Sequence, residues 1–289
     1  MNASVLISSC DAYSDCWSPL FRSLQQQWPG CPYPVALVCN EGNAASGPEN
    51  GSIISPRYIR VGPDRGWGPN LALALASVES DYVIYLQEDY FLDSPVSSEA
   101  MEQHLEYCIQ HGVDYLRLGW PWQDNREVKS VYSTGDDPDK AGCLPEGARE
   151  TVRYCDDAFG FRYALCLQPA IWRRSVLLQL SAMVHNGWEF ERTITQKIHA
   201  HQLRVCARVI HSSEYPAKGL KVVDGTAIRK GLWTRAGARY LNENGFEALL
   251  AGRETEGRVT DWLMHRERRW EKLPAVVLLR MMKALKINW

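Results

Sequence analysis

Residues 62–93 read GPDRGWGPNLALALASVESDYVIYLQEDYFLD, and this stretch decides the fold class. A loop rich in glycine and proline comes first, followed by an apolar helical segment over 70–79 and a strand over 81–87. The strand ends directly in Gln87-Glu88-Asp89. A loop, helix and strand in this order favour an α/β protein, whose ligands bind beyond the carboxyl ends of parallel strands. The acidic strand end is therefore the first candidate for a functional site.

The same alternation extends outward in both directions along the chain. Apolar, β-branched runs predict strands, and apolar residues at helical spacing predict the helices between them. We expect a mostly parallel sheet flanked by helices on both faces, with a long irregular stretch over 120–157. The expected strands are 4–9, 35–39, 57–61, 114–118, 162–172 and 203–210, and the expected helices are 17–28, 97–111, 173–184 and one starting near Trp188.

Composition excludes several classes of protein. The 289 residues are 45% hydrophobic and 23% charged, which excludes a disordered or collagen-like chain. A formal charge of -2 excludes bulk attraction to nucleic acid. The nine cysteines include no CxxC pair and lie mostly in apolar runs, which favours reduced thiols and a cytoplasmic location. We expect no secretory signal and no membrane-spanning helix, because no basic leader and no apolar run of about 18 residues is present.

The strand ending SSCD, the segment GWGPNLALALAS and the strand DYVIYLQED resemble, in this order, the GT-A glycosyltransferases, particularly the family-2-like group. The resemblance covers residues 4–92 and is weaker over 160–215. It implies a single Rossmann-like catalytic domain and a nucleotide-sugar donor. The family usually has Asp-x-Asp where this chain has Gln87-Glu88-Asp89, so only Asp89 matches a metal-contacting acid.

A carboxylate at a strand end can hold Mn²⁺ or Mg²⁺, with diphosphate oxygens and water as the other ligands. Asp89 is the expected metal ligand, and Glu88 and Asp89 are expected at the donor. The resemblance adds His211, which ends the strand RVCARVI, as a second metal ligand. Because Gln87 replaces an acid, we expect metal binding to be weak or dispensable. An acid pair that merely closes a strand, and a structural histidine, are the alternatives.

Glu189 and Glu191 in the segment WEFE are candidates for the catalytic base. In the resembled family an acidic pair at this place takes the proton from the acceptor hydroxyl. Two residues apart on a helix, the side chains point about 200° from each other, so one of the two is expected to face the site. The spacing slightly favours Glu189, and acids in a first helical turn also stabilise a helix by themselves.

Further residues complete the expected site. Asp11 is expected at the nucleotide base or ribose or, equally, as a loop cap, and Trp67 and Asn70 at the nucleotide pocket, unless Asn70 caps its helix. A basic, glycine-containing loop is expected to clamp the diphosphate. The clamp residues are Lys218, Lys221, Arg229 and Lys230, and the expected acceptor residues are Trp120, Trp122, Asp156 and Asp157.

The expected activity is transfer of a sugar, with inversion, from a nucleotide-diphosphate donor to a hydroxyl of a saccharide or lipid-linked saccharide. A nucleotidyltransferase acting on sugar phosphates and a non-enzymatic membrane-peripheral scaffold are the alternatives. We expect a catalytic domain over 1–225, with a donor half over 1–118 and an acceptor half over 119–225, and a basic helical extension over 226–289. The segment 262–289 has seven basic and two acidic side chains, which favours binding to an anionic membrane surface over packing on the catalytic domain.

Overall fold

The computed structural model describes residues 2–42, 54–119, 152–153, 165–201, 203, 205–210 and 217–257. The chain divides into two compact units, Met1–Ala227 and Ile228–Trp289. The first unit contains the expected α/β architecture. None of the helices in the described ranges is long and apolar enough to cross a bilayer.

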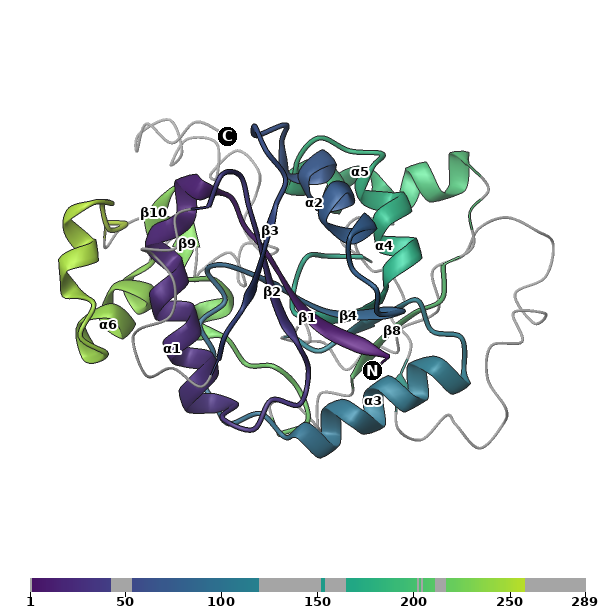
Figure 1. Cartoon of the computed structure of the whole chain (residues 1–289), viewed down its shortest axis with the longest axis horizontal. Coiled ribbons are helices and arrows are strands. Elements are labelled where there is room, and N and C mark those ends of the chain that lie inside the picture. The colour runs from purple at the N-terminus through teal and green to yellow at the C-terminus, as the bar shows by residue number, and fades with distance from the viewer. Residues whose placement is uncertain are drawn as a thin grey trace, which may run out of the picture. The chain divides into compact units, whose positions relative to one another are not determined.

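The first unit is built on an eight-stranded sheet in the order β3-β2-β1-β4-β7-β5-β8-β6. β7 and β6 are antiparallel to their neighbours, while β1 to β5 and β8 share one direction. The predicted mostly parallel sheet is thus confirmed (Figure 1). The strands are β1 Ala3–Ser8, β2 Val35–Cys39, β3 Arg57–Arg60, β4 Tyr82–Gln87, β5 Tyr115–Arg117, β6 Val152–Arg153, β7 Ala170–Arg173 and β8 Ala207–Ile210.

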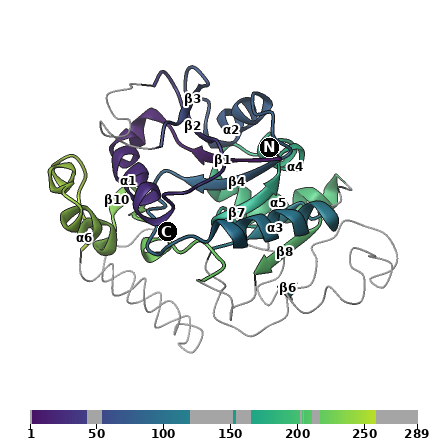
Figure 2. The same ribbon diagram turned by 60° about the horizontal axis from the view of Figure 1, so that its bottom comes forward.

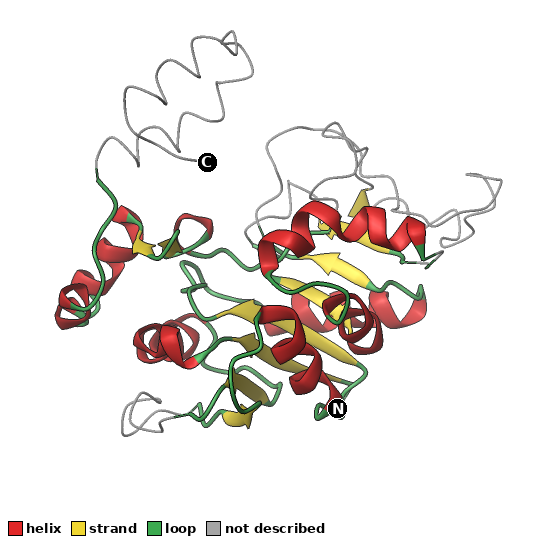
Figure 3. Ribbon diagram, turned by 90° about the horizontal axis from the view of Figure 1, so that it is seen from above, coloured by secondary structure: helices red, strands yellow, loops and turns green. Residues whose placement is uncertain are grey.

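Helices cover both faces of this sheet, as the views in Figures 2 and 3 show. α2, α4 and α5 lie over one face, and α1 and α3 lie over the other. Each strand supplies alternate side chains to the two layers. The elements are η1 Asp11–Cys16, α1 Trp17–Gln27, α2 Trp67–Ala76, α3 Ser98–Gln110, α4 Arg174–Ser181, α5 Gly187–Ala200 and η5 Val223–Gly225.

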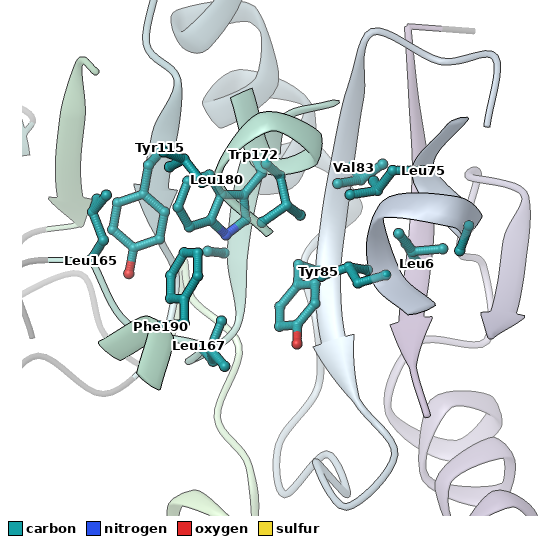
Figure 4. Close-up of a cluster of buried hydrophobic side chains, with 14 of the residues drawn as sticks. Leu6, Leu75, Val83, Tyr85, Tyr115, Leu165, Leu167, Trp172, Leu180 and Phe190 are labelled. Atoms are coloured by element: carbon teal, nitrogen blue, oxygen red, sulfur yellow. The ribbon is translucent and has the colours of Figure 1, made fainter. Parts of the chain in front are cut away.

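The core under α2, α4 and α5 surrounds β4 and β7. Trp172 and Tyr115 have ring centroids 4.4 Å apart, and Phe190 of α5 lies edge-on to Trp172 at 6.1 Å. Figure 4 shows these rings together, with Tyr85 on the neighbouring strand. Because Trp172 and Tyr115 are fully buried, this aromatic cluster fixes α5 against the sheet.

α2 begins at Trp67, three residues before the predicted start. Gly66 precedes the helix with a φ of 94°, and Pro69 fits the first turn because its nitrogen needs no partner there. Gly68 allows the helix to approach the end of α4: an added Cβ would lie 2.0 Å from the carbonyl oxygen of Val184. The start of α2 is therefore set by close packing against residues 181–185.

Two further expectations differ from the structure. Within the predicted strand 162–172, residues 165–169 are irregular, and the strand begins only at Ala170 and runs antiparallel. The second unit, predicted as helical, begins with an antiparallel pair, β9 Ile228–Arg229 and β10 Leu232–Trp233. α6 Arg235–Glu243 and η6 Glu247–Ala251 follow. In both segments the strands are set by backbone pairing, of β7 with β4 and β5 and of β9 with β10. The spacing of apolar residues alone does not reveal such pairing.

Candidate active site

The polar residues that follow β1, β2 and β4 gather at one edge of the sheet. The parallel register pairs Ser8 with Gln87, so β1 and β4 end side by side. Cys39 at the end of β2 pairs with Arg60 at the end of β3. Because these strands are parallel, the segments after Ser8, Cys39, Arg60 and Gln87 all emerge at their common carboxyl edge.

Asp11 ties two of these segments together. Its carboxylate accepts from the backbone N–H groups of Asn40 (2.9 Å), Glu41 (3.0 Å) and Gly42 (3.2 Å). Its own N–H donates to the side-chain oxygen of Asn40 at 3.1 Å. Burial alone would raise the pKa of Asp11, but the three N–H donors outweigh it and lower that pKa. Asp11 therefore acts as the loop cap that the sequence offered as an alternative to donor binding.

Asn70 closes the glycine-bearing loop that precedes α2. Its amide oxygen accepts from the N–H of Arg65 at 3.1 Å, and its amide nitrogen donates to Asp64 at 2.7 Å. Asp64 also accepts from the N–H of Gly66. Asn70 is buried within the first turn of α2 and does not cap the helix. It instead gives the 64–66 loop a fixed shape at the sheet edge.

Trp67 links β4 to α5. Its indole N–H donates to the hydroxyl of Tyr85 at 3.2 Å, and its ring meets Phe190 edge-on at 5.3 Å. Gln87 also donates to the Tyr85 hydroxyl. The position where the resembled family usually has an acid thus holds an amide, which contacts a side chain of the strand it ends.

Glu88 and Asp89 occupy different environments. Burial and then the charge of Glu88 raise the pKa of the Cys10 thiol to about 11, which places Glu88 beside the end of β1. Asp89 is 7% exposed, and its carboxylate accepts from the Thr226 hydroxyl. The N–H of Ala227 donates to the Asp89 carbonyl at 2.9 Å. The acid expected at the metal is therefore turned inward toward Thr226, and Glu88 is half-buried at the carboxyl edge of the sheet.

The segment after the acidic pair is joined to residues 221–227. The N–H of Val223 donates to Phe91, the N–H of Asp93 donates to Lys221, and the Lys221 ammonium lies 2.5 Å from the Asp93 carboxylate. Lys221, expected at the donor diphosphate, thus pairs with Asp93. Lys218 is exposed, whereas Arg229 and Lys230 belong to the second unit, in which Arg229 pairs with Glu256.

Glu189 stabilises the start of α5. One carboxylate oxygen accepts from the N–H of His185 at 2.8 Å, and the other pairs with Lys197 at 2.9 Å. Asn186 accepts from the N–H of Glu189, which completes a reciprocal cap. The His185 N–H and the Lys197 ammonium lower the pKa of Glu189. A carboxylate held in this way is a weak proton acceptor.

Glu191 points toward the sheet. Its Oε1 accepts from the N–H of Leu167 at 2.9 Å, and the Leu167 carbonyl accepts from the Tyr90 hydroxyl at 2.9 Å. Burial raises the pKa of Glu191, although the Leu167 N–H and the charge of Arg117 oppose this effect. The two candidate bases thus point apart, as helix geometry predicts, and Glu191 is the one with raised basicity.

Tyr90, Leu167 and Arg117 were not singled out from the sequence. Tyr90 directly follows Asp89, so a single buried side chain connects the acidic strand end to the residue that holds Glu191. Arg117 is buried at the end of β5, and its Nη1 lies 3.4 Å from the Cys166 sulfur. A basic residue inside the apolar run DYLRL was the available sign of a buried charge near the site.

The described residues fit a divalent cation only weakly. Within the described ranges no three His, Cys, Asp or Glu side chains come together as ligands. Asp89 faces Thr226, and Glu88 is the half-buried carboxylate at the edge. A cation here would be held by Glu88 and otherwise by ligand oxygens and water.

Several expected residues lie outside the described ranges: Trp120, Trp122, Asp156, Asp157 and His211. The second half of the basic extension, residues 258–289, lies outside them as well. Their expected roles at the acceptor, the metal and a membrane surface stay predictions.

Comparison with known proteins gives structural likeness only. No protein-family model and no curated protein matches the sequence. S. aureus TarS is 15% identical at a TM-score of 0.40, with 74% of this chain and 37% of that chain covered. A CMP:2-keto-3-deoxy-manno-octonic acid synthetase complexed with CTP is 15% identical at a TM-score of 0.41. The match covers 87% of this chain and 99% of that chain. A cytidylyltransferase from Leptospira borgpetersenii is 12% identical at a TM-score of 0.37. The match covers 68% of this chain and 71% of that chain. This chain therefore spans well under two thirds of the TarS chain, and likeness at this level says nothing about the reaction.

Proposed function

We propose that this protein is a nucleotide-sugar-dependent glycosyltransferase in which Glu191 is the general base. The observation that carries the proposal is the placement of Glu191: a half-buried carboxylate of raised pKa, held by Leu167 and linked through Tyr90 to the acidic end of β4. A carboxylate so placed can take a proton from an acceptor hydroxyl, which contributes about 10²–10⁴ in rate.

The chemistry proposed for this site is a direct displacement. The acceptor hydroxyl loses its proton to Glu191 as its oxygen forms a bond to the anomeric carbon of the donor sugar. The bond from that carbon to the diphosphate oxygen breaks, and the nucleoside diphosphate leaves with the electron pair. Inversion follows, because the proposed site uses no covalent nucleophile.

The donor is proposed to lie along the carboxyl edge of β1, β2 and β4. Asp11 and Asn70 hold the 40–42 and 64–66 loops that frame this edge, and Trp67 lies between the edge and α5. Glu88 is the proposed site for a weakly bound Mn²⁺ or Mg²⁺, which would neutralise charge on the leaving diphosphate.

The test is nucleotide release from a panel of UDP-, GDP-, CMP- and dTDP-sugars, with the full chain and with Glu191→Gln. A glycosyltransferase releases a nucleoside diphosphate or monophosphate from one donor, and Glu191→Gln slows transfer. A nucleotidyltransferase instead forms pyrophosphate from a nucleoside triphosphate and a sugar phosphate. A protein that binds no member of either panel is not a nucleotide-sugar enzyme.

A further inference from the structure

Trp188, the second residue of α5, is exposed to an unusual degree. Its exposed fraction is 63%, whereas Trp17, Trp28, Trp172 and Trp233 are at most 1% exposed. A large aromatic side chain that remains in water contributes little to folding, because its stabilising effect comes from buried area. The ring of Trp188 is therefore accessible to a ligand that could cover it.

The helix places Trp188 on the same side of α5 as Glu191. Residues three apart on a helix lie about 60° from each other, one turn apart. The neighbouring Gly187 lies directly against Leu167, because a Cβ there would come within 2.9 Å of the Leu167 side chain. Since Leu167 also holds Glu191, Trp188 lies at the rim of the proposed base site.

The surroundings of this ring are polar. Asn186 and Arg192 are exposed, and Glu189 is half-buried. The other large apolar side chains that stand exposed in the described ranges, Leu73 and Ile109, belong to α2 and α3. A single aromatic face among hydrogen-bonding groups suits a sugar ring, which has an apolar C–H face and a rim of hydroxyls, better than a broad apolar protein surface.

We propose that Trp188 is the stacking platform for a pyranose ring of the acceptor. This inference rests on the proposed function, because it takes Glu191 as the group that meets the acceptor hydroxyl. The ring of Trp188 would cover the C–H face of the acceptor sugar and hold one of its hydroxyls toward Glu191. The acceptor class is accordingly a saccharide with an accessible pyranose face.

Direct binding tests the platform without reference to activity. The full chain is labelled with 5-fluorotryptophan, and Trp188→Phe identifies the Trp188 fluorine signal. Methyl β-glycosides of glucose, galactose and N-acetylglucosamine are the probes, with glycerol as the non-stacking control. We expect a saturable shift of the Trp188 signal with at least one glycoside and none with glycerol. The inference is overturned if no glycoside shifts the Trp188 signal. It is also overturned if that signal shifts only with protein concentration, which would indicate that a second copy of the chain covers the ring.

Kinetics separate this inference from the proposed function. We expect Trp188→Ala to raise the acceptor KM about tenfold and to raise the donor KM far less, with Trp188→Tyr close to wild type. Leu73→Ala removes another exposed apolar side chain and should change neither value. If donor hydrolysis is present but Trp188→Ala keeps the wild-type acceptor KM, the platform is wrong and the proposed function stands. If no nucleotide sugar is bound or hydrolysed, the proposed function fails, and the fluorine titration alone decides whether Trp188 binds a sugar.

Discussion

The backbone N–H of Leu167 donates to Glu191 Oε1 across 2.9 Å. This contact joins the irregular segment before β7 to the first turns of α5, and it fixes one oxygen of a carboxylate whose pKa is raised. The neighbouring Glu189 makes its contacts with His185 and Lys197 instead. The two acids therefore form a matched pair for experiment.

Replacement of each acid by its amide should separate their roles in catalysis. Glu191→Gln keeps an oxygen that can accept from Leu167 but cannot take a proton, so kcat should fall by about 10²-fold or more with little change in donor affinity. Glu189→Gln should stay within a few-fold of wild type. Steady-state transfer rates with both variants check this. Equal losses, or a larger loss with Glu189→Gln, would remove Glu191 from the role of base.

The same two variants should differ in their effect on stability. Burial raises the pKa of Glu191 in the folded protein above its ordinary 4.5. The free energy of unfolding therefore falls as the pH rises from 4.5 through the raised pKa, because the buried carboxyl group must then ionise. Glu191→Gln should therefore unfold at the wild-type temperature or above it at neutral pH. Glu189 has a lowered pKa and stabilises the folded state above its ordinary 4.5, so Glu189→Gln should lose about 0.5–1 kcal/mol at neutral pH and less in acid. Thermal melts over a pH series measure both effects.

Tyr90 is expected to act on Glu191 through Leu167. Tyr90→Phe removes the hydroxyl that donates to the Leu167 carbonyl. The hydrogen bond from the Leu167 N–H to Glu191 should then weaken, and the pKa of Glu191 should rise, because this N–H lowers it in the wild type. The acidic limb of the kcat/KM profile should then move to higher pH, with a stability loss of about 1 kcal/mol. Tyr82→Phe is the control, because the Tyr82 hydroxyl donates to the carbonyl of Cys108 away from the site. A pH profile that shifts equally in both variants would contradict a positioning role for Tyr90.

Asp89 and Thr226 should be energetically coupled. Asp89→Ala removes the acceptor of the half-buried Thr226 hydroxyl, and Thr226→Val removes a donor to the buried Asp89 carboxylate, each at an expected cost of about 1–3 kcal/mol. The double variant should lose less than the sum of the two. Urea unfolding of the four proteins gives the coupling. Additive losses would show that Asp89 is not held by Thr226, and the earlier expectation of an outward, metal-contacting Asp89 would then regain support.

Glu88 is the carboxylate whose replacement should change the response to metal. We expect Glu88→Gln to keep the wild-type melting temperature and to abolish any stimulation by Mn²⁺ or Mg²⁺. Exhaustive EDTA treatment should reduce wild-type activity to the level of that variant. Full wild-type activity after EDTA would show that the leaving diphosphate is neutralised by cationic side chains and not by a metal.

The fold was predictable where apolar runs are long and unambiguous. β1, β2 and β4 begin and end within a residue of expectation, because each is a continuous buried run in the middle of a sheet. β7 was predicted too early and without its direction. Its position depends on pairing with β4 and β5 on either side, which no local spacing encodes.

The site was predictable as a region but not residue by residue. Helix geometry implied that Glu189 and Glu191 diverge. The spacing slightly favoured Glu189 as the base, and the cap that Glu189 forms with Asn186 becomes visible only in the structure. Asp89 was expected at the metal because it follows a strand and matches the resembled family. The chain turns at residues 88–89, immediately after β4, and Asp89 contacts Thr226, which is 137 positions away and could not be read from the local sequence.

The contact between Asp89 and Thr226 joins residues 137 positions apart in the sequence. During synthesis at about 5–20 residues per second, Thr226 leaves the ribosome roughly 7–27 s after Asp89. Until then the turn that carries Glu88 and Asp89 lacks its contacts with Thr226 and Ala227. A nascent chain can therefore assemble β1, β2 and β4 early, but its acidic edge takes its final form only near the completion of the first unit, so a partly made chain should lack the proposed donor site until that point.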